Sequence, residues 1–178
     1  MVTIRVPLVE QRDASYDILI APGLVQQLDK ILPQYCPAAA YALITDSHVG
    51  KLYGEKLVGT LHDGRLHAEL FTFPAGEGNK TRDTWASLSD RMLAAHFGRD
   101  SAVIALGGGV VNDVGGFVAA TYLRGVPLVQ VPTTLLAMID SSIGGKTGVD
   151  LPAGKNLVGA FHQPRLVEIG RASCRERV

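Results

Sequence analysis

Charged side chains gather in one glycine-rich, otherwise apolar stretch of this 178-residue sequence. Arg124, Lys146 and Lys155 lie in it, together with the carboxylate of Asp140. Lysine and arginine are rarely buried without a partner, so their accumulation among apolar runs indicates a pocket for an anionic ligand. Arginine suits a phosphate group in particular, because its planar fork binds two oxygens at once.

A phosphate-binding turn is predicted just before these side chains. The strand-type run 101–106 breaks at the glycines 107–109, and an apolar helix start follows. Glycines allow the backbone to approach a ligand closely, and unpaired N–H groups at a helix start attract anions such as a pyrophosphate. The spacing differs from the dinucleotide fingerprint, because Asn112 stands where the third glycine would be. On the triplet alone, an ordinary strand-to-helix turn without a ligand is about equally compatible with the sequence.

Strand-type runs alternate with helical patterns along the chain, which predicts an α/β fold with a mainly parallel sheet and helices on both faces. Further expected strands are 41–45 and 67–73, and expected helices are 24–32, 47–61 and one that carries Trp85, Leu88, Met92 and Leu93 on a single packed face. Pro33 is expected to end the first helix. Two β-prone runs, 3–8 and 16–21, suggest an antiparallel start. Ligands of such folds bind at the carboxyl ends of the strands.

Composition narrows the class of partner. The 17 basic and 17 acidic side chains give a formal net charge of zero, so no bulk attraction to nucleic acid or membrane is indicated. No apolar run approaches the roughly 20 residues that span a bilayer, and the start lacks a signal-peptide pattern. We expect a cytoplasmic protein with a small-molecule substrate. The two cysteines, Cys36 and Cys174, have neither metal-ligand nor disulfide spacing.

Several longer motifs follow one another along the chain. They are GGGVVND at 107–113, GFVAATY at 116–122, PTTLLA at 132–137, DSSIGGKT at 140–147 and KNLVGAFHQP at 155–164. Together they resemble the 3-dehydroquinate synthase family, up to about Val167. The resemblance implies a Rossmann-like NAD-binding domain over residues 1–169. The family's C-terminal helical metal-binding domain is expected to be absent here, and residues 170–178 form a tail unlike the family.

The resemblance also implies an activity, that of a carbon–oxygen lyase of the shikimate pathway. Such an enzyme converts 3-deoxy-D-arabino-heptulosonate 7-phosphate to 3-dehydroquinate and phosphate, with NAD and a divalent metal, zinc or cobalt, as cofactors. The family's metal ligands lie in the absent part, so this chain alone is expected to be inactive and to hold no metal. The full-length family member is expected to be a homodimer. Two alternatives stay open: a related sugar phosphate cyclase of the inosose synthase type, and a nucleotide-binding fragment without catalysis.

The resemblance assigns roles to individual residues. The cofactor-binding residues that it implies are Asp46, Glu77, Lys80, Gly108, Gly109, Val110, Val111, Asp113, Thr133, Thr134, Asp140, Lys146 and Lys155. The catalytic and substrate-binding residues that it implies are Asp140, Lys146, Lys155, Asn156 and Arg124, the last directed at the substrate phosphate of a neighbouring subunit.

Simpler interpretations exist for several of these residues. Asp46 could merely cap the next helix, and Glu77 and Lys80 could form a solvated pair in an exposed turn. Asp140 could be a cap or a buried polar partner, and Lys146 a solvated turn lysine.

Overall fold

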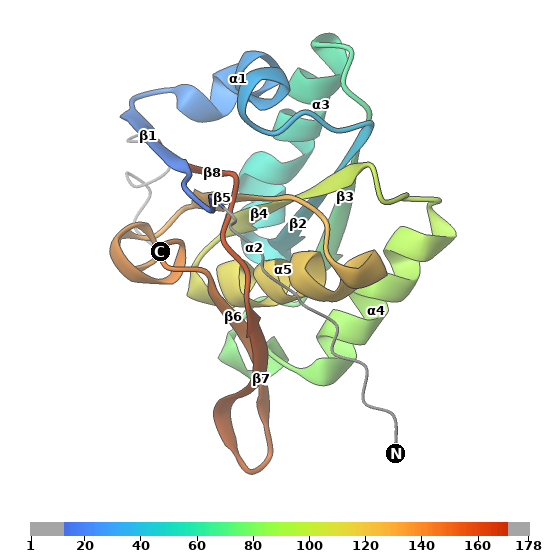
Figure 1. The fold of residues 1–178 in the computed structure, drawn as a ribbon, viewed down its shortest axis with the longest axis vertical. Helices are drawn as coiled ribbons and strands as arrows, with labels where there is room; N and C mark the ends of the chain where they lie inside the picture. Colours follow the sequence, from blue (N-terminus) through green and yellow to red (C-terminus); the bar gives the residue numbers. More distant parts are fainter. Residues whose placement is uncertain (1–12, 171–178) are drawn as a thin grey trace, which may run out of the picture.

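The computed structural model describes residues 13–170, which form a six-stranded parallel sheet with helices on both faces (Figure 1). The strand order is β1-β8-β5-β4-β2-β3. The strands are β1 (Asp17–Ala21), β2 (Ala40–Asp46), β3 (Ala68–Phe73), β4 (Ser101–Gly107), β5 (Leu128–Pro132) and β8 (Leu166–Gly170). The predicted α/β class with a parallel sheet is confirmed.

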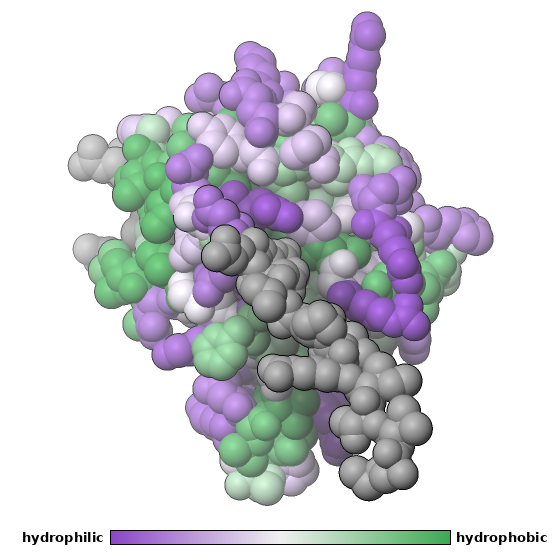
Figure 2. All heavy atoms as spheres, in the orientation of Figure 1, coloured by the Kyte–Doolittle hydropathy of each residue, from purple (hydrophilic) through white to green (hydrophobic). Residues whose placement is uncertain are grey.

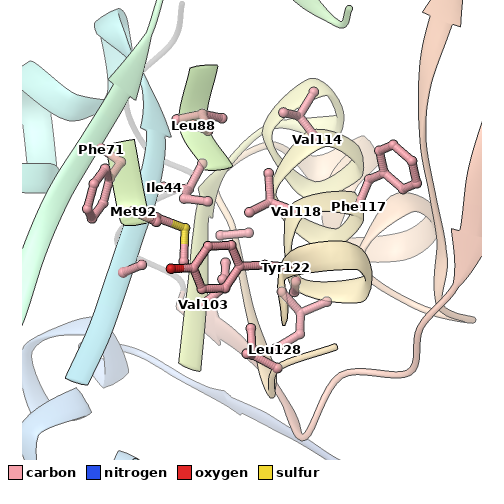
Figure 3. Packing of buried hydrophobic residues seen from close by; sticks show 14 of the residues in the cluster. Ile44, Phe71, Leu88, Met92, Val103, Val114, Phe117, Val118, Tyr122 and Leu128 are labelled. Carbon is pink, nitrogen blue, oxygen red and sulfur yellow. The ribbon is translucent and has the colours of Figure 1, made fainter. Parts of the chain in front are cut away.

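Alternate residues of the central strands face opposite layers of helices, because side chains of a strand alternate between its two faces. The helices are α1 (Leu28–Tyr35), α2 (Ser47–Val49), α3 (Glu55–Asp63), α4 (Arg82–Ala94) and α5 (Gly109–Thr121). Tyr41 and Leu43 of β2 pack with α1 and α3 on one face. Ala42 and Ile44 pack with α4 and α5 on the other, the layer seen in Figure 3.

This arrangement makes the carboxyl ends of β2 and β4 a candidate ligand site. The two strands are neighbours, with Thr45 paired to Leu106. The chain leaves β2 toward α2 and α3 on one face, and leaves β4 into α5 on the other. Neighbouring strands whose helices depart to opposite faces form a topological switch point, where open α/β sheets bind their ligands. Asp46 ends β2 and Gly107 ends β4, so both lie at this point.

A two-stranded antiparallel hairpin stands apart from the main sheet, formed by β6 (Lys146–Leu151) and β7 (Gly154–Phe161). In Figure 1 it projects below α5. A side chain at Gly116 of α5 would collide with Thr147 of β6, so glycine permits the hairpin to pack closely on this helix. None of the helices in the part of the chain that the structure describes is long and apolar enough to cross a membrane.

Two local predictions were wrong. Helix α1 continues through Pro33 to Tyr35, because packing of the fully buried Leu28 and Leu32 outweighs the cost of the proline. The Cys36 N–H closes the last turn on the Leu32 carbonyl at 2.8 Å. Leu93 is 51% exposed, since it lies one residue, or roughly 100°, beyond the buried Met92. The strand of the 16–21 run, β1, pairs in parallel with β8 on one side and forms the edge of the sheet on the other. The antiparallel start stays a prediction, because the 3–8 run lies outside the described residues, as do residues 171–178 of the predicted tail.

Candidate cofactor and substrate site

The predicted strand, glycine turn and helix start are all present at the switch point. Strand β4 ends at Gly107, and α5 begins at Gly109 with Gly108 as an N-cap that supplies no side-chain hydrogen bond. A Cβ atom at Gly107 would lie 2.5 Å from Val111 Cγ2, so only glycine permits this tight return of the helix. The first N–H groups of α5 therefore lack a side-chain acceptor, which leaves them available to an anion.

The 133–134 segment lies beside this turn. The Thr133 N–H donates to the Gly107 carbonyl at 2.9 Å, and a Cβ atom at Gly108 would lie 3.3 Å from the Thr134 methyl group. Val111 is fully buried and Val110 half-buried, so Val111 could reach a ligand only through its backbone. The structure thus brings together the predicted pyrophosphate-binding residues at one strand end.

Asp46 caps the helix that follows β2. Its Oδ1 accepts hydrogen bonds from the His48 and Val49 N–H groups, both at 2.8 Å. The simpler interpretation, that Asp46 caps the next helix, is therefore correct. The second carboxylate oxygen has no hydrogen bond to any described residue, so the cap leaves one acceptor for a ligand hydroxyl. The ribose contact stays a prediction.

Lys80 is buried, with 4% of its surface exposed, which rules out the solvated turn pair. Its Nζ donates to Asp113 Oδ2 of α5 and to Asn156 Oδ1 of β7, each at 2.5 Å. Asp150 Oδ1 of β6 lies 3.9 Å from the same nitrogen. One buried ammonium group thus joins the β3–α4 loop, helix α5 and the hairpin, and its charge is paired with the carboxylate of Asp113.

Burial governs the acidity of Asp113. Its pKa is raised from the ordinary aspartate value because burial disfavours the charged form, and the hydrogen bond and charge of Lys80 only partly oppose this effect. A second ion pair, between Lys155 and Glu77, is different in kind. Lys155 Nζ lies 3.0 Å from Glu77 Oε1, and these side chains are 70% and 52% exposed. This pair is solvated, and such pairs stabilise a fold little.

A cavity of about 550 Å³ lies between α5, the 140–143 segment and the hairpin. Four predicted site residues line it: Asp113, Asp140, Lys146 and Asn156. Asp140 belongs to the π-helical turn Ala137–Ser141, a rare conformation that occurs often at functional sites. Lys146 is exposed on β6, and its side chain forms no hydrogen bond or ion pair within the described residues. The cavity therefore offers both a carboxylate and a cation to a ligand.

Apolar side chains surround this cavity. Ile143, Leu157 and Phe161 line it and are 37%, 58% and 82% exposed. Leu135, Leu136 and Ile139 nearby in sequence are also at least 65% exposed. Figure 2 shows apolar surface where the hairpin projects. An open, partly apolar rim of this kind is typical of a ligand or protein contact surface.

Arg124 is not part of this group. It lines a second cavity, of about 350 Å³, together with His162, Gln163 and Arg165. The two cavities share only Phe161 among the residues that line them. Residues 13–170 contain no group of three or more His, Cys, Asp or Glu side chains that could hold a metal ion.

Sequence reasoning missed three residues of the site, namely Asp150, Asn112 and Ser141. Asp150 contacts Lys80 and the Asn156 N–H, and nothing in its local sequence signals this. Asn112 Nδ2 donates to Ser141 Oγ at 3.3 Å, which ties α5 to the π-helical turn. A polar residue in an otherwise apolar helix, at the place of the third glycine, was the available signal for Asn112.

Comparisons with known proteins identify the family of this chain. A family model described as 3-dehydroquinate synthase N-terminal matches residues 70–175. The 3-dehydroquinate synthase of Symbiobacterium thermophilum is 54% identical over 89% of this chain and 44% of its own length, and that of Caulobacter vibrioides is 49% identical over 87% and 42%. This chain thus spans less than half the length of these curated relatives.

A solved structure extends the comparison. The crystal structure of 2-deoxy-scyllo-inosose synthase complexed with carbaglucose-6-phosphate, NAD+ and Co2+ superposes with a TM-score of 0.83 at 30% identity, over 90% of this chain and 44% of that one. The fold, the motifs and the family match therefore agree, and the chain belongs to the 3-dehydroquinate synthase family, to whose N-terminal part it corresponds.

Proposed function

We propose that this chain forms the NAD-binding part of a 3-dehydroquinate synthase, which converts 3-deoxy-D-arabino-heptulosonate 7-phosphate to 3-dehydroquinate and phosphate. One observation carries the proposal: the uncapped glycine turn at the switch point lies on the same helix, α5, as Asp113, which borders the 550 Å³ cavity with Asp140 and Lys146. A nucleotide site and a polar substrate cavity thus meet on one helix.

The residues at the switch point fit a dinucleotide. The first N–H groups of α5 would hold the pyrophosphate, with Gly108 and Gly109 leaving room for close approach and Thr133 and Thr134 beside them. The uncommitted oxygen of Asp46, at the end of the neighbouring strand β2, would accept from the adenosine ribose. NAD bound in this way would supply a reversible hydride acceptor to the reaction.

The cavity residues would bind and orient the sugar phosphate. Lys146 offers an exposed ammonium group to an anion or a developing negative charge, and Asp140 on the π-helical turn can hold a hydroxyl group or its proton. Lys80 would fix Asp113 and Asn156 at the cavity wall. Lys155 and Glu77 line a separate cavity of about 470 Å³, which Lys80 also borders. No step is assigned to a metal ion, because the described residues provide no ligand set for one.

Arg124 would bind a substrate in the site of a neighbouring subunit, and not in the 550 Å³ cavity of its own chain. Because it lies apart from Asp140 and Lys146, its guanidinium suits a phosphate group presented by a neighbouring subunit, as in the homodimer that we propose for the full-length protein. We also propose a cytoplasmic location, without a nucleic-acid or membrane partner.

A related sugar phosphate cyclase is the second candidate, favoured by the superposition on 2-deoxy-scyllo-inosose synthase. Identity separates the two: 54% to the Symbiobacterium thermophilum 3-dehydroquinate synthase against 30% to the inosose synthase. A chimera of residues 1–167 with the C-terminal remainder of the Symbiobacterium relative tests the choice. We expect phosphate release from the heptulosonate phosphate and none from glucose 6-phosphate. The reverse preference would favour the inosose type.

Calorimetric titration of the chain with NAD tests the cofactor site. We compare the wild-type chain with Asp46→Ser, because serine keeps the helix cap but cannot present a carboxylate to the ribose. Loss of hydrogen bonds to a charged acceptor predicts binding weaker by roughly tenfold to a hundredfold. Asp90→Ser, the same change on the exposed surface of α4, is the matched control. Equal affinity of all three chains would reject the ribose assignment, and no binding by any of them would reject the cofactor site.

A further inference from the structure

The hairpin contains an irregularity at the point where it carries two candidate site residues. Its register pairs Val149 with Val158, yet Leu151 with Gly154. One residue of β6, Asp150, therefore stands opposite three residues of β7, residues 155–157. A bulge of this kind re-aims side chains, and bulges are frequent beside active sites. Here the extra residues include Lys155 and Asn156.

Asp150 supplies the hydrogen bonds that the ladder loses at this bulge. Its Oδ1 accepts from the Asn156 N–H at 2.7 Å. Its own backbone N–H donates to the Lys80 carbonyl at 2.8 Å instead of across the hairpin, and Thr81 forms an isolated parallel bridge with it. Asp150 thus binds the bulged segment of β7 through its side chain and the loop that carries Lys80 through its backbone.

The bulge holds Asn156 in an uncommon backbone conformation. Its φ is 56°, in the left-handed region, which asparagine tolerates better than most residues but which still needs support from its surroundings. In this conformation the Asn156 side chain reaches Lys80 Nζ. Without the Asp150 acceptor, the Asn156 N–H would lose its partner, and the extended ladder conformation would turn the side chain elsewhere.

We propose that Asp150 is a positioning residue of the site: it fixes the 155–157 bulge so that Asn156 meets Lys80 and Lys155 reaches the cofactor edge. The role rests on the proposed function, since it acts through residues assigned to NAD and substrate. What the role requires of Asp150 is a side-chain oxygen that accepts the hydrogen bond of the Asn156 N–H. The carboxylate charge is secondary, because the Lys80 nitrogen is 3.9 Å away and already donates to two closer oxygens.

Amide hydrogen exchange and NAD titration of the 178-residue chain test this role. In Asp150→Ala the exchange rate of the Asn156 amide should rise at least tenfold, while other β6–β7 ladder amides change little, and NAD affinity should fall roughly tenfold. Asp150→Asn keeps an acceptor oxygen, so exchange and affinity should both stay within about threefold of wild type. Asp90→Ala on α4 controls for loss of one negative charge.

The outcomes separate the alternatives. Unchanged Asn156 exchange in Asp150→Ala would overturn the proposal, as would equal losses of affinity in the Ala and Asn variants, since the charge would then be what matters. If the whole hairpin exchanges in Asp150→Ala, Asp150→Glu decides: it keeps the charge but moves the acceptor by one methylene, so Asn156 protection should still fall. If wild type binds no NAD, the cofactor assignment fails, while the exchange data still decide whether Asp150 holds the bulge.

Discussion

Glu168 offers the sharpest test of the energetics of this fold. It lies on β8, between β5 and β1, and its side chain is fully buried. Neither carboxyl oxygen has a hydrogen-bond partner within the described residues. Burial raises the pKa of Glu168 from 4.5 to about 8, because the charged form is strongly disfavoured away from water. A buried acid without a partner should destabilise the folded state.

The sign of the pH dependence follows from this shift. The folded chain holds the proton of Glu168 up to about pH 8, whereas the unfolded chain loses it near pH 4.5. Stability is therefore greatest below pH 4.5 as far as this group is concerned, and falls as the pH rises toward 8. At roughly 1.4 kcal/mol per pH unit, the loss is about 3 kcal/mol at pH 7 and about 5 kcal/mol above pH 8.

Urea unfolding of wild type, Glu168→Gln and Glu168→Val between pH 5 and 9 measures this loss. The Gln variant cannot ionise, so its free energy of unfolding relative to wild type should rise by about 3 kcal/mol between pH 5 and 8. The Val variant should be more stable still, because it removes the unpaired polar atoms as well. A difference between Gln and wild type that stays flat with pH would refute the reasoning.

Three further substitutions probe the site by urea unfolding. Lys80→Met leaves the Asp113 carboxylate buried without its cation, so we expect a loss of about 3 kcal/mol; a loss below about 1 kcal/mol would contradict a tightly held network. Glu77→Ala breaks only the exposed pair with Lys155, and should change stability by less than about 1 kcal/mol, whereas a larger change would show that this pair is structural. Gly107→Ala places a methyl group against α5, so a loss of about 1–3 kcal/mol is expected, and a neutral result would argue against the tight turn.

Local signals predicted those parts of the fold that depend on nearby residues. The strand at 101–106, the glycine turn and the helix after it were all correct, because a continuous apolar run, glycine freedom and helix starts are read within a few positions. Pro33 shows the limit of such signals. A proline marks a probable helix end, but tertiary packing of the fully buried Leu28 and Leu32 keeps this short helix intact across it.

The contacts of the site were beyond these signals. Resemblance supplied the identities of Lys80, Asp113 and Asn156, but not that one buried nitrogen joins them across 33 and 76 positions of sequence. Asp150 was missed because its role depends on hairpin register, and a bulge changes register without altering the alternation of residue types. The helix cap of Asp46, in contrast, depends only on neighbouring residues, and the sequence predicted it correctly.

The lysines of the site divide into two kinds, and this division limits what each can do. An ammonium group has three donors, and Lys80 commits two of them to Asp113 and Asn156 while the Asp150 carboxylate lies 3.9 Å away. It therefore has little capacity for a ligand, and its charge is already balanced. Lys146 is exposed at the cavity and carries no such partners. We accordingly expect Lys80 to hold the walls of the site in place before any ligand arrives, and Lys146 to be the cation that binds one.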